Sequence, residues 1–84
     1  MPEFVVRIAL PDRPGALGLV ASRIGSVSGD IVAINILERD DGLAVDEFVV
    51  ELREHLVELL RTEIHEVDGV EVLDIRPVEV GEVR

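Results

Sequence analysis

The run Asp12-Arg13-Pro14-Gly15-Ala16-Leu17 holds the residues of this chain whose types and spacing favour ligand binding. Pro14 fits the first position of a helix, where its missing N–H costs nothing, and Asp12 is placed to cap the amides of the first turn. Gly15 has no Cβ, so another group can approach the backbone closely there. The free amides and the positive end of the helix dipole would attract an anionic or polar group. The same residues also fit a well-capped helix start that binds nothing.

The composition excludes several classes of partner. The 84-residue chain carries 18 Asp and Glu against eight basic residues, all Arg, for a formal charge of −10. With two Phe and no Tyr or Trp, it lacks the basic footprint and the stacking platforms of nucleic-acid-binding proteins. Neither a long apolar span nor a basic terminus indicates a membrane partner. The chain has no Cys, which fits a reducing compartment, and we expect a cytoplasmic protein.

Hydrophobic periodicity predicts six elements in the order βαββαβ. Alternating residues indicate strands, helical spacing indicates helices, and the Asp40-Asp41-Gly42 run is typical of a hairpin turn. Gly29 is expected to end the first helix in the left-handed conformation. The predicted strands span 4–10, 30–38, 43–52 and 70–78, and the predicted helices span 16–28 and 53–67.

Two βαβ halves with right-handed crossovers predict an α+β, ferredoxin-like sandwich. In this fold a four-stranded antiparallel sheet carries both helices on one face. Strands 4–10 and 43–52 would be central, and strand 30–38 would be an edge. We expect one domain over residues 1–84, in which 79–84 form a polar tail.

Three runs of the sequence together carry a family resemblance. They are Leu10-Pro11-Asp12-Arg13-Pro14-Gly15-Ala16-Leu17, Gly29-Asp30-Ile31 and Val45-Asp46-Glu47-Phe48-Val49-Val50. Over nearly its whole length the chain resembles an ACT domain, and the third run is more weakly similar to the ACT repeats of bacterial uridylyltransferases. The resemblance implies a regulatory module that binds an amino acid or a related small metabolite and controls an attached or partner enzyme. It also implies side-by-side pairing of two subunits.

The resemblance implies a ligand site between the turn of one subunit and the second strand of the other. The turn would contribute Asp12, Arg13, Pro14, Gly15, Ala16 and Leu17, and the facing strand would contribute Asp30, Ile31 and Val32. Asp12 and Asp30 stand where amino-acid sensors of this family often have Asn. A ligand carboxylate about 4 Å from either would meet repulsion of about 4 kcal/mol. We therefore expect an amino or neutral polar group there, although Asp30 is also an ordinary turn residue at a strand start.

Small residues on the first predicted helix indicate a contact with a second subunit. Gly18, Ser22, Gly25 and Gly29 share one flank, and glycine inside a helix costs about 1 kcal/mol relative to alanine unless packing requires it. Leu19 points away from the core side of the same helix. We expect a homodimer that pairs through the edge strand 30–38 and the helix 16–28.

Other polar residues do not form a catalytic or metal site. His55 and His65 lie ten residues apart on the second predicted helix, with no third ligand near them in the sequence. Asp46 and Glu47 are neighbours in a strand, so they point to opposite faces and one of them must lie toward the helices. We expect no catalytic residues, no metal and no cofactor, and hence no enzyme activity. The competing hypothesis is a dimerisation or docking module with a vestigial ligand site.

Overall fold

The computed structural model describes residues 1–79 of the chain. The elements follow the predicted βαββαβ order, with a short 3₁₀ helix, η1, added before the second α-helix. The predicted tail residues 80–84 lie outside the described residues. The bounds are β1 (Glu3–Pro11), α1 (Ala16–Ser26), β2 (Asp30–Asp40), β3 (Leu43–Glu51), η1 (Glu54–Leu56), α2 (Val57–His65) and β4 (Glu71–Pro77).

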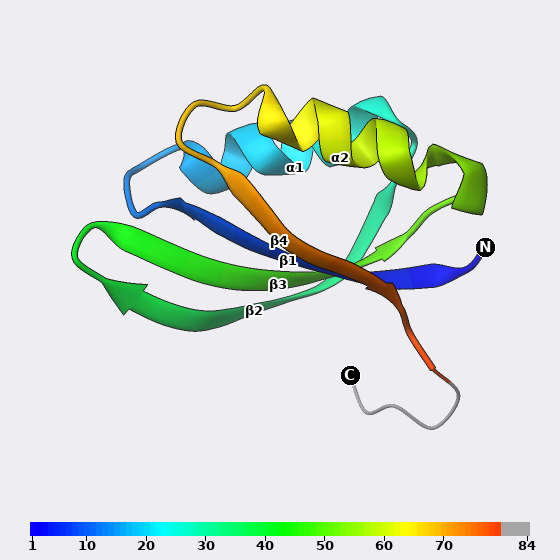
Figure 1. Cartoon of the computed structure of the whole chain (residues 1–84), viewed down its shortest axis with the longest axis horizontal. Coiled ribbons are helices and arrows are strands. Elements are labelled where there is room, and N and C mark those ends of the chain that lie inside the picture. The colour runs from blue at the N-terminus through cyan, green and yellow to red at the C-terminus, as the bar shows by residue number, and fades with distance from the viewer. Residues whose placement is uncertain (80–84) are drawn as a thin grey trace.

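The four strands form one antiparallel sheet in the order β2-β3-β1-β4. Both helices cover the same face of this sheet (Figure 1). The predicted ferredoxin-like sandwich is therefore confirmed, with β1 and β3 central and β2 at an edge. Within residues 1–79, no helix is both long enough and apolar enough to cross a membrane.

The core fills the space between the sheet and the helices. Alternate residues of β1 and β3 point into it, because strand side chains alternate between faces. The helices contribute residues at helical spacing from the other side. The most deeply buried side chains are Val6, Ile8, Val20, Ile24, Phe48, Val50, Leu52, Leu60 and Ile64.

The hairpin between β2 and β3 lies at the predicted Asp40-Asp41-Gly42 run, with Asp41 and Gly42 as its two-residue turn. Asp41 and Gly42 both have positive φ, 50° and 79°, while Asp40 pairs with Leu43. Positive φ at both central residues lets a two-residue turn match the right-handed twist of the strands that it joins. The turn places the last residues of β2 beside the start of β3, which pairs on its other side with the end of β1.

The end of helix α1 corrects the prediction for Gly29. Ser28 takes the left-handed position, with φ of 62°, and donates to Gly25 O at 3.0 Å, while Gly29 donates to Ile24 O at 3.0 Å. These two bonds form a Schellman motif in which Ser28 occupies the usual glycine position. Gly29 serves close packing instead, because a Cβ there would lie 2.8 Å from Ile24 Cγ2 and 3.1 Å from Val50 Cγ1.

Candidate functional site

The connection from β1 to α1 is a β-turn rather than the first turn of the helix. Ala16 N–H donates to Arg13 O at 3.3 Å, and Gly15 has φ 87° and ψ −16°. Proline followed by a glycine with positive φ is the signature of a type II turn. Helix α1 therefore begins at Ala16, and the expectation that Pro14 occupies its first position is wrong. Gly15 is needed for its positive φ and not for close approach, since no described atom lies within 4 Å of a Cβ built there.

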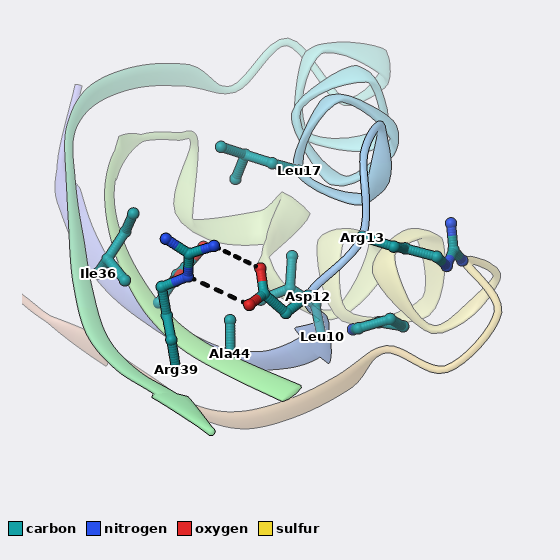
Figure 2. Close-up of a pocket in the computed structure, with 9 residues that line it drawn as sticks. Leu10, Asp12, Arg13, Leu17, Ile36, Arg39 and Ala44 are labelled. Atoms are coloured by element: carbon teal, nitrogen blue, oxygen red, sulfur yellow. Dashed lines mark hydrogen bonds and ion pairs between the residues drawn. The ribbon is translucent and has the colours of Figure 1, made fainter. Parts of the chain in front are cut away.

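Asp12 binds a side chain of β2 instead of capping the helix, so the capping prediction is also wrong. Arg39 donates from Nη2 to Asp12 Oδ1 at 3.1 Å and from Nε to Asp12 Oδ2 at 3.2 Å. The two side chains point at each other across the space between the turn and β2 (Figure 2). In addition, Asp12 N–H donates to Gly42 O at 2.8 Å. The β1–α1 turn is thus bonded to the β2–β3 hairpin twice, through the backbone amide of Asp12 and through its carboxylate.

A cleft of about 210 Å³ lies between this turn, the start of α1 and the adjoining ends of β2 and β3. Apolar side chains form its walls, among them Leu17 and Ile36, which lie on opposite sides in Figure 2. Asp12 and Arg39 add a pair of opposite charges to this lining. The lining residues are Leu10, Pro11, Asp12, Arg13, Leu17, Ile36, Arg39, Ala44 and Asp46.

Asp46 is the buried polar residue of the cleft. It pairs with Ile8 of β1 and Ile36 of β2, so it faces the helix side of the sheet, and only 3% of it is exposed. Its Oδ1 has no hydrogen-bond partner among residues 1–79. Burial raises the pKa of the Asp46 carboxyl, the negative charge of Asp12 raises it further, and Arg39 partly offsets both effects.

Glu47 lies on the opposite face of β3, as strand alternation predicts. Its Oε2 accepts hydrogen bonds from Arg7 Nη2 at 2.6 Å and from Arg7 Nε at 3.0 Å. The prediction that Asp46 and Glu47 point to opposite faces is confirmed. Two adjacent carboxylates therefore have different surroundings, one paired near the surface and one buried without a partner for Oδ1.

Three of the predicted turn residues line the cleft: Asp12, Arg13 and Leu17. The Arg13 side chain extends away from the cleft in Figure 2, and its Nη2 lies 3.5 Å from the carbonyl oxygen of Asp68. Pro14 and Gly15 are exposed on the turn. The turn thus contributes one charged and one apolar side chain to the interior of the cleft.

The remaining predicted site residues lie elsewhere in the chain. Ala16 is 1% exposed and belongs to the core. Asp30, Ile31 and Val32 lie at the opposite end of β2, where Asp30 pairs with Glu51. The cleft within one chain does not include them, so their contribution from a second subunit stays a prediction.

Sequence reasoning missed six of the residues that line the cleft, namely Leu10, Pro11, Ile36, Arg39, Ala44 and Asp46. Strand alternation indicated that either Asp46 or Glu47 faces the helices. This was the only local sign in the sequence that Asp46 could line a cleft. Arg39 carries no such signal, because its contact depends on how the hairpin brings the end of β2 to the turn. Among residues 1–79, no group of three His, Cys, Asp or Glu side chains could hold a metal ion.

Solved structures supply the comparison, since neither a protein-family model nor a curated protein matches the sequence. An ACT domain protein from Streptococcus pneumoniae matches with TM-score 0.70 and 16% identity, over 99% of this chain and 97% of that one. The ACT domain from the GTP pyrophosphokinase of Chlorobium tepidum matches with TM-score 0.67 and 17% identity, over 90% and 96%. The chain has the ACT fold.

The ACT fold also matches part of a longer enzyme. A formyltetrahydrofolate deformylase from Burkholderia mallei matches with TM-score 0.72 and 15% identity, over 92% of this chain and 28% of the deformylase. The resemblance predicted from the three sequence runs is confirmed at the level of the fold. Sequence identities of 15–17% to these structures show a shared fold and nothing more specific.

Proposed function

We propose that this chain is a regulatory domain that binds an amino acid or a similar small metabolite and controls an attached or partner enzyme. The observation that carries the proposal is the cleft beside the β1–α1 turn, with its apolar walls and few polar groups. Its volume of about 210 Å³ is below the roughly 300–1,000 Å³ of pockets that hold drug-sized molecules. A molecule of amino-acid size suits it. The ACT fold in a GTP pyrophosphokinase and in part of a deformylase supports a regulatory rather than a catalytic role. The proposed location is the cytoplasm, which rests on the absence of Cys from the sequence.

The proposed domain acts as a homodimer through β2 and α1. Edge strands expose unpaired backbone groups that readily pair with another chain. Along β2, Val32, Ile34 and Ile36 are 47%, 42% and 58% exposed, and Leu19 of α1 is 51% exposed. Exposed apolar side chains on an edge strand and on a helix favour burial against a second copy. The pairing would use residues 30–38 and 16–28, as the sequence predicts.

Such a dimer gives a route from binding to regulation. In the proposed arrangement, Asp30, Ile31 and Val32 of the partner subunit approach the turn, and the ligand lies between two subunits. A ligand that contacts both subunits binds better to one arrangement of the pair than to another, and it shifts the population by that difference. An attached enzyme would respond to the altered arrangement.

Thermal denaturation of the full chain with a panel of small molecules tests the proposal. The panel contains the amino acids, the nucleobases and other small metabolites. A ligand at about 100 times its Kd adds about 2.7 kcal/mol to the stability of the native state. For a domain of this size that raises Tm by roughly 10–20 °C. A panel in which no compound raises Tm would contradict ligand sensing.

A dimerisation or docking module with a vestigial ligand site is the second candidate. The exposed apolar residues of β2 and α1 favour it, because they require a partner whether or not a ligand binds. A panel without any response, together with a dimer in sedimentation equilibrium, would support this candidate over the first. A monomer under the same conditions would contradict both.

A further inference from the structure

We propose that the cleft selects ligands that carry a primary ammonium group and that Asp46 is the residue that binds this group. The inference rests on the proposed function, because it names the chemistry of the ligand in the same cleft. It also goes beyond the predicted site, since Asp46 lies on β3 and not on the turn or on the predicted facing strand.

The unpartnered carboxylate oxygen of Asp46 is the first observation. Native proteins leave few buried polar atoms without a hydrogen bond, and each exception requires a reason. Asp46 lines the cleft and is 3% exposed, yet Oδ1 has no partner in the part of the chain that the structure describes. Its neighbours on the same face of β3, Ala44 and Phe48, are apolar and buried. An apolar residue at position 46 would serve packing better, so a carboxylate there indicates a binding role.

The charges around the cleft are the second observation. The Arg39 guanidinium donates two hydrogen bonds to Asp12, so these two charges pair with each other. Arg13 points away, toward the carbonyl oxygen of Asp68. Arg39 also attracts the carboxylate of Asp46, so among the described lining residues Asp12 and Asp46 share one guanidinium, and one negative charge of the cleft is left unbalanced. A ligand with one positive charge would balance it, whereas a ligand carboxylate would add repulsion from both Asp12 and Asp46.

The size and lining of the cleft distinguish among cations. A metal ion needs several protein ligands, and residues 1–79 contain no group of three suitable side chains. A primary ammonium is a compact charge with three donors, and a single carboxylate can hold it. The apolar walls, including Leu10, Leu17 and Ile36, would cover an aliphatic body. The Arg39 side chain is 62% exposed, so it can move aside as a ligand enters.

The test compares matched probes that differ in the amino group. The probes are leucine, 3-methylbutylamine, 4-methyl-2-oxopentanoate and 4-methylpentanoate, and the same comparison is made for the other aliphatic amino acids. Binding to the full chain is followed by Tm and by NMR chemical-shift titration. We expect the probes with an ammonium group to bind and the others not to bind. Response to the amine without its carboxylate distinguishes an amine ligand from an amino acid.

Two variants assign the effect to Asp46. Asp46→Asn keeps the shape of the side chain and removes its charge, and we expect at least tenfold weaker binding of the ammonium probes. Glu47→Gln makes the same charge change at the adjacent residue, on the opposite face of the sheet, and should bind them as the wild type does. If Asp46→Asn does not fold, the comparison of probes on the wild-type chain still decides the outcome.

Three different results would overturn the ammonium preference, the role of Asp46 and the ligand-binding function, respectively. Binding of the probes without an amino group as tightly as leucine would overturn the ammonium proposal and leave ligand sensing intact. Equal binding of leucine to wild type and Asp46→Asn would overturn the role of Asp46. Absence of any response to these probes and to the wider panel would overturn the ligand-binding function itself.

Discussion

Replacing Asp46 with asparagine should make the protein more stable at neutral pH. Asp46 is 3% exposed and its Oδ1 lacks a partner among residues 1–79. Leaving a buried acceptor unpaired costs about 1–3 kcal/mol, and more when it is charged. Asparagine removes the charge but keeps one carbonyl oxygen, so we expect a gain near the lower end, about 1 kcal/mol. In a domain of this size that corresponds to a rise in Tm of roughly 4–8 °C.

The gain should depend on pH in a defined direction. The pKa of Asp46 is raised above its ordinary value of 3.8 by burial and by Asp12, with Arg39 opposing. The native state therefore binds the proton more tightly than the unfolded state does. This stabilising contribution is fully present below about pH 3.8 and is lost as the pH rises through the raised pKa. The advantage of Asp46→Asn should accordingly be largest at neutral pH and shrink as the pH falls toward 3.8.

Urea denaturation at a series of pH values between about 4 and 8 measures this difference. Glu47→Gln is the matched control, because Glu47 is paired with Arg7 and its loss should lower stability by no more than about 1 kcal/mol. An Asp46→Asn protein less stable than the wild type at pH 7.5 would refute the reasoning. So would a gain that stays constant across the pH series.

Three glycine substitutions test other parts of the structure. Gly15→Ala should lower stability by about 1–2 kcal/mol in urea denaturation, since φ is 87° there; an unchanged midpoint would contradict the type II turn. Gly29→Ala should cost about 1–3 kcal/mol, because its Cβ would lie 2.8 Å from Ile24 Cγ2, whereas Gly25→Ala has open space around it and should be neutral or stabilising. Gly18→Leu should fold normally, since no described atom lies within 4 Å of a Cβ there, but should weaken the proposed dimer. Unchanged sedimentation would exclude this flank of α1 as the contact.

The sheet and its layers could be predicted because burial repeats with a fixed period. Phe4, Val6 and Ile8 alternate with less buried or opposite-facing residues, so the sequence itself marks the core side of β1. The Pro14-Gly15 pair could not be assigned in this way. Proline suits both the first position of a helix and the second position of a type II turn, and the left-handed φ of Gly15 decides for the turn.

The cleft was less predictable because its contacts join distant segments. Asp12 and Arg39 are 27 residues apart, and their pairing depends on how the hairpin returns β2 to the turn. Alternation indicated that Asp46 or Glu47 faces the helices. That Asp46 Oδ1 has no partner depends on which neighbouring side chains can reach it, and a one-dimensional pattern does not contain this information.

The double attachment of Asp12 has a consequence for local opening of the molecule. Its amide is bonded to Gly42 O, and its carboxylate is bonded to Arg39 of the same hairpin. The Asp12 amide can exchange its hydrogen with solvent only when the turn separates from the hairpin at that point. The protection factor of this one amide therefore reports the free energy needed to part the two walls of the cleft. Hydrogen exchange at Asp12 thus follows the opening of the cleft in the unliganded protein.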